Sequence, residues 1–262
     1  MPEQQIADGQ LNYRFEGPVD APVLVLSHSL GADLHMWEAQ LPRFTESFRV
    51  LRHDARGHGG SSITPGPYSI ELFGQDVLAL VDALGIDRFA FCGLSIGGLV
   101  GQWLGINAGE RLTRLVLCST GAKLGTVEAW NQRIDAVASG GAEAMRTMAK
   151  GAVERWFTPA FTERHPQQAN RFEQMVASTS PEGYAAACAA VRDADFREQL
   201  GGIRVPTLIV CGTRDSVATP EHAAFLQSKI EGAGLATFDA AHLCNVEMEQ
   251  AFNHCVLDFL RG

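Results

Sequence analysis

The run Phe89-Ala90-Phe91-Cys92-Gly93-Leu94-Ser95-Ile96-Gly97-Gly98 joins a short apolar segment to a Gly-x-Ser-x-Gly pentapeptide. Residues 89–92 have the composition of a buried strand, and residues 99–104 continue with apolar side chains at helical spacing. A serine on so sharp a strand-to-helix turn exposes its hydroxyl, and the crowded backbone requires glycine two positions before and after it. In this setting the pentapeptide predicts that Ser95 is a nucleophile.

Strand-like and helix-like segments alternate on both sides of this turn. Short apolar runs predict strands at residues 11–15, 23–26, 48–51, 115–118, 205–211 and 236–239. Ser69 and Gly85 are placed to begin and end a helix through Leu84, and residues 251–260 predict a closing helix. Short apolar strands separated by helices indicate an α/β fold with a mostly parallel, doubly wound sheet.

One interval departs from this alternation. About 85 residues separate the strands at 115–118 and 205–211, although a crossover needs only about a dozen. Helical patterns fill the interval at 127–138, 142–157 and 167–177, and a last one begins at Ser180-Pro181. Ligands of such sheets bind at the carboxyl ends of the strands, so the insertion is interpreted as a lid, with a decorative subdomain as the alternative. We therefore expect a core of residues 1–121 and 193–262 and a helical cap of residues 122–192.

Two further turns complete a catalytic set. Asp215 follows the strand at 205–211 and His242 follows the strand at 236–239, so both lie just past a strand end, as Ser95 does. The chain order nucleophile, acid, base is one of the known orders of serine enzymes. Imidazole is matched to taking the serine proton, and a carboxylate fixes its tautomer and stabilises the imidazolium. The three residues are therefore predicted to form a catalytic triad.

The tetrahedral intermediate of this chemistry needs two backbone N–H groups that converge on its oxyanion. Ile96 directly follows the nucleophile at the start of a helix, so its N–H is the first expected donor. The loop Ser27-His28-Ser29-Leu30-Gly31 follows the strand at 23–26, and its Leu30 N–H is the second. His28 is interpreted as structural, and His53 and His58 as flanking a tight turn.

Composition argues against several classes of function. The 262 residues are 46% hydrophobic, enough for one enzyme-sized core, and the formal net charge of −9 disfavours a nucleic-acid partner. Six scattered cysteines without a C-x-x-C pair indicate reduced thiols, and no residue cluster has metal-ligand spacing, so we expect no metal and no cofactor.

The sequence also bears on location and partners. No apolar run has the length of a membrane span, and residues 1–10 lack the pattern of a cleaved leader, so we expect a cytoplasmic protein with no membrane partner. The sequence does not determine the oligomeric state, and a homo-oligomer stays an alternative.

Five segments carry a family resemblance: LSHSLGADLHMW (residues 26–37), CGLSIGG (92–98), AWNQRI (129–134), ERWFTP (154–159) and PEGYAAAC (181–188). With these segments the whole chain resembles the α/β-hydrolases and, more closely, the 3-oxoadipate enol-lactonases of bacterial aromatic catabolism. Cys244 departs from the family pattern, which has serine there. The resemblance implies an α/β-hydrolase fold with an inserted helical cap, and hydrolysis of 3-oxoadipate enol-lactone to 3-oxoadipate in the β-ketoadipate pathway.

The implied substrate is a small anionic lactone, and an acidic protein needs a pocket cation to hold its carboxylate. Trp130 and Arg133 lie three residues apart on the first cap helix and share a face, and an arginine beside an aromatic wall suits such a ligand. Lys123 is the competing cation, and a solvated Arg133 is the other alternative. His35, after Leu30, is a further candidate for the pocket.

Alternative functions stay open on the sequence alone. Another small-ester or lactone esterase, or a carbon–carbon bond hydrolase, would use the same fold and triad. A non-catalytic ligand-binding receptor on a hydrolase scaffold belongs to a different class, and it need not keep all three triad residues.

Overall fold

A computed structural model describes residues 2–262; Met1, the first residue of the expected core, lies outside the described residues. These residues form a sheet of eight strands in the order β1-β2-β4-β3-β5-β6-β7-β8. The strands are β1 (Glu3–Ile6), β2 (Gly9–Glu16), β3 (Val23–Ser27), β4 (Arg49–His53), β5 (Phe89–Leu94), β6 (Leu112–Cys118), β7 (Thr207–Gly212) and β8 (Gly234–Phe238). The pairs β1/β2 and β2/β4 are antiparallel and the other pairs are parallel, which confirms the mostly parallel sheet.

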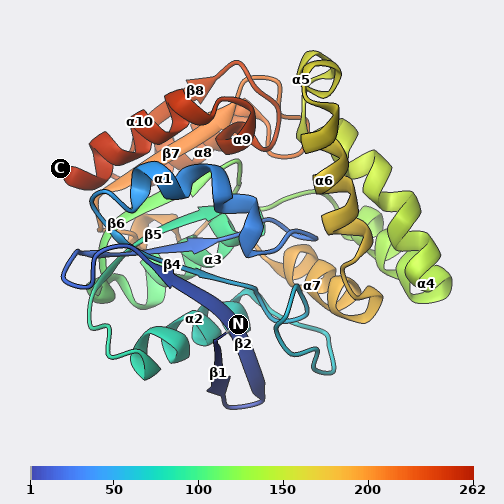
Figure 1. Cartoon of the computed structure of the whole chain (residues 1–262), viewed down its shortest axis with the longest axis horizontal. Coiled ribbons are helices and arrows are strands. Elements are labelled where there is room, and N and C mark those ends of the chain that lie inside the picture. The colour runs from blue at the N-terminus through green and yellow to red at the C-terminus, as the bar shows by residue number, and fades with distance from the viewer. Residues whose placement is uncertain (1) are drawn as a thin grey trace.

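Helices cover both faces of this sheet (Figure 1). One face carries α2 (Ile70–Ala83), α3 (Ile96–Asn107), α8 (Pro220–Lys229) and the short 3₁₀ helices η2 (Gly109–Arg111) and η3 (Leu200–Gly202). The other carries the 3₁₀ helix η1 (Leu34–Gln40), α1 (Leu41–Phe44), α9 (Cys244–Glu247) and α10 (Glu249–Arg261). Strands β5 and β7 are buried along their whole length between these layers, so they appear in the sequence as continuous apolar runs.

The ends of α2 illustrate how the sequence sets an element. The Ser69 hydroxyl accepts a hydrogen bond from Leu72 N at 3.1 Å, which satisfies one of the free N–H groups of the first turn. Beyond the end of the helix, Gly85 has φ +69°, a left-handed conformation that glycine adopts without steric cost.

Four helices form the cap: α4 (Val127–Trp156), α5 (Pro159–Arg164), α6 (Pro166–Ala177) and α7 (Pro181–Asp193). They lie together at one end of the sheet, on the right of Figure 1. Phe196 N donates to Ala122 O at 2.9 Å, so the chain leaves and re-enters the core at neighbouring points. The cap helices thus occupy nearly the same interval as the cap expected at residues 122–192.

The sequence predicts the interior of the cap only in part. Gly141 has φ 54° and ψ −135°, and this break falls where the Gly-Gly pair predicts a helix end, although both halves belong to one kinked α4. The sequence patterns do not predict helix α5. It begins at Pro159 after the N-cap Thr158, where the sequence predicts only the end of a helix.

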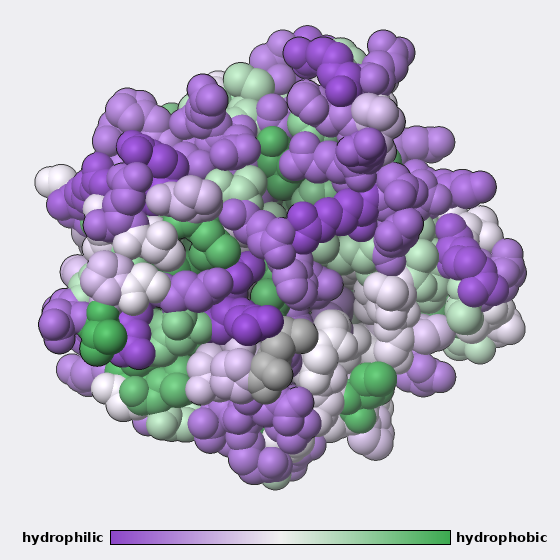
Figure 2. All heavy atoms as spheres, in the orientation of Figure 1, coloured by the Kyte–Doolittle hydropathy of each residue, from purple (hydrophilic) through white to green (hydrophobic). Residues whose placement is uncertain are grey.

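The face of the molecule in Figure 2 is covered mainly by hydrophilic residues, with small separate patches of hydrophobic ones. Between residues 2 and 262 no helix combines the length and the hydropathy that a membrane span requires.

Candidate active site

Ser95 lies between β5 and α3 with φ 59° and ψ −113°, a backbone conformation that residues with side chains rarely adopt. Its N–H donates to Cys118 O at 2.9 Å, and its carbonyl accepts from the Thr120 hydroxyl at 2.8 Å, so the end of β6 holds the turn. A Cβ atom on Gly93 would lie 2.0 Å from Gly97 O. The close approach of these two backbones explains why the pentapeptide needs glycine there.

Asp215 and His242 meet beyond the ends of two neighbouring strands. Gly212 at the end of β7 pairs with Phe238 at the end of β8, so the two following turns leave the sheet together. His242 Nδ1–H donates to Asp215 Oδ2 at 2.8 Å, and both side chains are buried. Because Nδ1 carries the proton, Nε2 of the neutral ring is free to accept one.

Asp215 is itself held rigidly. Its Oδ1 accepts from the backbone N–H groups of Val217 at 2.7 Å and Ala218 at 3.0 Å. Those contacts fix the carboxylate and leave Oδ2 to accept from the imidazole.

Ser95 and His242 line one cavity of about 220 Å³ between the core and the cap. Its other lining residues are Ser29, Leu30, Ser216 and Val217 from the core, and Leu124, Gly125, Ala129, Trp130, Arg133, Ala152, Arg155, Trp156, Val176 and Tyr184 from the cap region. Within residues 2–262 no hydrogen bond joins Ser95 Oγ to the His242 ring. Such bonds commonly tighten only when substrate is bound.

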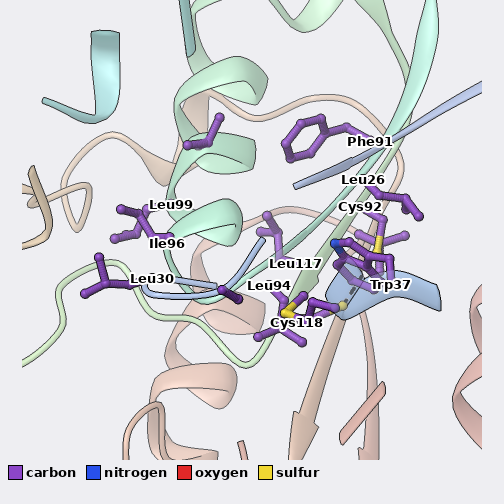
Figure 3. Close-up of a cluster of buried hydrophobic side chains, with 14 of the residues drawn as sticks. Leu26, Leu30, Trp37, Phe91, Cys92, Leu94, Ile96, Leu99, Leu117 and Cys118 are labelled. Carbon is purple, nitrogen blue, oxygen red and sulfur yellow. Dashed lines mark hydrogen bonds between the residues drawn. The ribbon is translucent and has the colours of Figure 1, made fainter. Parts of the chain in front are cut away.

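The two expected oxyanion donors lie at equivalent positions after two adjacent strands. Ser27 of β3 pairs with Gly93 of β5, and Leu30 and Ile96 each follow three residues later. Neither the Leu30 N–H nor the Ile96 N–H donates to another group in the described part of the chain. Figure 3 shows Leu30 beside the start of α3, where Ile96 lies. Both N–H groups are therefore available to a ligand oxygen.

Two of the residues expected to contact substrate, Lys123 and His35, are not among those that line this cavity. Lys123 Nζ forms an ion pair with Asp195 Oδ2 at 3.1 Å and lines a separate hollow. His35 lies in η1, where its Nδ1 is 3.0 Å from Oδ1 of Asp33, the N-cap residue of that helix. In each case a nearby carboxylate holds the side chain elsewhere.

Trp130 and Arg133 do line the cavity, with the Arg133 guanidinium carbon 4.8 Å from the Trp130 ring centroid. Arg155, in the last turn of α4, lines the rim of the same cavity. Partial burial, and secondly the charge of Arg133, lowers the pKa of Arg155. Among the residues that the structure describes, neither arginine forms an ion pair, although the charge of Glu154 also acts on Arg155, so two arginines line the cavity without a salt-bridge partner.

Among the lining residues that the sequence did not predict, Arg155 and Tyr184 bear on the chemistry of the cavity. Burial raises the pKa of the Tyr184 hydroxyl to about 12, so the phenol stays neutral at the cavity wall. Both residues belong to the segments ERWFTP and PEGYAAAC, which carried the family resemblance, and that was the only signal for them. No arrangement of three or more His, Cys, Asp or Glu side chains suited to a metal ion occurs in residues 2–262.

The model of the alpha/beta hydrolase fold family matches residues 22–247. The chain therefore belongs to the alpha/beta hydrolase fold family.

Within that family the chain is similar to enol-lactonases. The 3-oxoadipate enol-lactonase 2 of Acinetobacter baylyi is 42% identical, over 95% of this chain and 92% of the relative. The crystal structure of the enol-lactonase from Burkholderia xenovorans LB400 matches with a TM-score of 0.97 and 41% identity, over 100% of both chains. A hydrolase from Pseudomonas aeruginosa PA01 matches with a TM-score of 0.94 and 48% identity, over 97% of this chain and 95% of that one.

Proposed function

We propose that this chain hydrolyses 3-oxoadipate enol-lactone to 3-oxoadipate, a step in the bacterial breakdown of aromatic compounds. One observation carries the substrate class: Arg133 and Arg155, neither of which forms an ion pair, line the same cavity as Ser95 and His242. In a chain of net charge −9, such a pair of cations favours a small ester that bears a carboxylate. Similarity to enol-lactonases over nearly the whole chain supports the particular lactone.

In the first half of the reaction Ser95 Oγ attacks the lactone carbonyl, and His242 Nε2 takes the serine proton. Negative charge develops on the carbonyl oxygen, where the N–H groups of Leu30 and Ile96 stabilise it. The bond from the acyl carbon to the ring oxygen then breaks. His242 gives the serine proton to that oxygen, which leaves as an enol; since an enol is a better leaving group than an alcohol, this acid role is undemanding, and His242 is neutral again.

In the second half a water molecule attacks the acyl-serine while His242 takes its proton, and Ser95 is released with its proton restored. The product carries a new carboxylate, and its enol end becomes a ketone. Asp215 stays ionised throughout and stabilises the imidazolium that forms in each half.

Arg133 and Arg155 hold the substrate's side-chain carboxylate, and Trp130 forms the wall beside it. A guanidinium presents parallel N–H donors that match the two carboxylate oxygens. The substrate is thus a small anion. We place the enzyme in the cytoplasm, with no nucleic acid or membrane as its partner.

Steady-state kinetics on three substrates tests the proposal. We expect kcat/KM for the enol-lactone to exceed that for a neutral aryl acetate by on the order of a hundredfold, because only the lactone uses the arginines. A dienone acid should be turned over poorly. Preference for the aryl acetate would indicate a general esterase, and preference for the dienone acid a carbon–carbon bond hydrolase. A chain that turns over none of the three and resists fluorophosphonate labelling would be a receptor.

A further inference from the structure

The loop Ser27-His28-Ser29-Leu30-Gly31, here called the oxyanion loop, carries the buried His28 and contacts a second buried histidine, His58. The proposed reaction uses neither ring. His28 belongs to the loop after β3 and His58 to the turn after β4, and each is 1% exposed. Their ring centroids are 5.2 Å apart. Buried imidazoles need hydrogen-bond partners, so the contacts that they make indicate what they hold in place.

The hydrogen bonds define one tautomer for each ring. His58 Nε2 accepts from Gly31 N at 3.0 Å, so its proton is on Nδ1, which lies 3.2 Å from Arg56 O. His28 Nε2 accepts from Ala55 N at 2.9 Å, and its Nδ1–H donates to Ser29 O at 2.8 Å. Each histidine therefore joins the oxyanion loop to the turn after β4 as a neutral ring.

These contacts bracket the expected oxyanion donor. The Leu30 N–H belongs to the peptide unit whose carbonyl is Ser29 O, the atom that His28 holds. In a trans peptide the N–H points away from the carbonyl, so fixing Ser29 O also fixes the direction of the Leu30 N–H. The next N–H along the chain, that of Gly31, is the one that His58 holds.

Gly31 has φ +77°, a conformation that glycine adopts without steric cost, so contacts from outside the loop help to define its backbone direction. The turn that carries His58 is held by a buried ion pair. The Arg56 guanidinium makes a bidentate ion pair with Asp76 of α2, at 2.9 and 2.6 Å, with both side chains buried.

We propose that His58 is a positioning residue of the oxyanion hole: its Nε2 holds the Gly31 N–H and, with His28, fixes the peptide that presents the Leu30 N–H. The turn after β4, which the Arg56–Asp76 ion pair holds, thereby sets the direction of a donor on the neighbouring loop. This proposal rests on the serine hydrolase mechanism proposed above, but not on which ester is hydrolysed.

Three substitutions at His58 distinguish the effect of its hydrogen-bond acceptor from the effect of its side-chain volume. His58→Gln places an amide oxygen near the position of Nε2, His58→Asn is too short to reach it, and His58→Leu removes the acceptor. Losing an oxyanion donor outright costs about 10²–10³ in kcat, so a loosened donor should cost about tenfold or more. We expect this loss for the Leu and Asn variants, with KM within about threefold of wild type, and substantial recovery in His58→Gln.

His53→Leu is the matched control. His53 is equally buried and next to the same turn, but neither of its ring nitrogens has a partner within residues 2–262. Its kcat should therefore stay within about twofold of wild type. All variants are assayed on both a neutral aryl acetate and the enol-lactone, so a failure of the proposed lactone specificity would not be mistaken for a failure at His58.

Affinity for phenylboronic acid gives a second readout, because its tetrahedral adduct on Ser95 places an oxygen in the oxyanion hole. His58→Asn should bind it about tenfold more weakly than His58→Gln does, which decides the question even if His58→Leu does not fold. Equal kcat and equal boronate affinity in the Gln and Asn variants would overturn the proposal. So would a His58→Leu enzyme with wild-type kcat.

Discussion

Ser95 holds a strained backbone conformation, φ 59° and ψ −113°, which costs a residue with a side chain on the order of 1–3 kcal/mol. Contacts from the end of β6 offset that cost: Ser95 N donates to Cys118 O, and Thr120 donates to Ser95 O. The strain has a chemical use, because it aims the hydroxyl at the cavity instead of at the helix that follows.

Arg133 should determine selectivity for an anionic ester. We predict that Arg133→Ala lowers kcat/KM for the enol-lactone roughly thirtyfold, equivalent to about 2 kcal/mol, since the substrate carboxylate then lacks its charged partner. Arg133→Lys should recover part of this loss, because an ammonium cannot reproduce the bidentate contact. Arg155→Ala at the rim should cost less than Arg133→Ala.

Two controls accompany this series. Hydrolysis of a neutral aryl acetate should be nearly unchanged in every arginine variant. Lys123→Ala should behave as wild type on both substrates, because Lys123 is paired with Asp195 outside the cavity. Equal losses of Arg133→Ala on the lactone and on the aryl acetate would show that the arginine supports only the structure of the cap.

The sequence predicts residues whose position follows from local chain geometry. Ser95, Asp215 and His242 each follow a strand end, and parallel strands bring such ends to one edge. The cations of the cap follow no such rule. Lys123 and Arg155 both lie within the cap expected at residues 122–192. Which of them faces the cavity depends on the packing of α4 and on the ion pair with Asp195.

The cap is joined to the loop that carries His242. Glu247 of α9 accepts from Ala241 N at 3.0 Å and from Thr158 N at 3.3 Å, and its other oxygen accepts from the Thr158 hydroxyl. Leu243 N donates to Trp156 O at 3.0 Å. Leu243 is thus bonded to the end of α4, and Ala241 is linked through Glu247 to Thr158, the N-cap residue of α5.

Removing this junction should affect both stability and catalysis. We predict that Glu247→Ala lowers the free energy of unfolding by about 2 kcal/mol, because it leaves two backbone N–H groups without an acceptor. It should also lower kcat on both esters, since the loop carrying His242 loses its support. Denaturant titration and steady-state kinetics measure the two effects.

Glu249→Ala is the matched control for this prediction. Glu249 is exposed in the first turn of α10, and its loss should change stability by about 0.5 kcal/mol or less. If Glu247→Ala were as stable and as active as Glu249→Ala, the junction would have no role.

Longer helices whose first residues include a capping side chain could be predicted from the sequence. Helices whose limits depend on packing against other helices could not. Ser69 and Ser180 cap their helices with side-chain acceptors where the sequence predicts a helix start. Helix α5 was missed because six residues carry too little periodicity to be recognised. The kink of α4 at Gly141 was anticipated as a break, but whether the two halves stay one element depends on α6 and α7, which pack against α4.

Across the whole molecule, buried histidines should make stability depend on pH. Burial is the main cause that lowers the pKa of His53 to about 4 and that of His58 to about 3. Both rings are neutral in the folded protein, whereas in the unfolded chain they bind a proton below their ordinary value of about 6.5. The unfolded state then binds more protons, so stability falls as the pH falls from 6.5 towards 4.

We predict that each of these histidines lowers the free energy of unfolding by about 2 kcal/mol when the pH falls from 7 to 5. Denaturant unfolding of wild type and of His53→Leu at the two pH values measures this term, because the carboxylates contribute equally to both proteins. The variant should lose less stability on acidification than wild type does. Identical losses in the two proteins would show that His53 titrates normally in the folded state.

The central claim is that Ser95 opens the enol-lactone by covalent catalysis. Its most direct test is the loss of enol-lactone absorbance with purified wild type and Ser95→Ala, each after exhaustive chelation of metals. Wild type should keep its full rate, since serine chemistry needs no metal, and Ser95→Ala should lose several orders of magnitude in kcat while keeping its fold. A Ser95→Ala enzyme with more than about a tenth of the wild-type rate, or a chelated wild type whose activity only added metal restores, would contradict it.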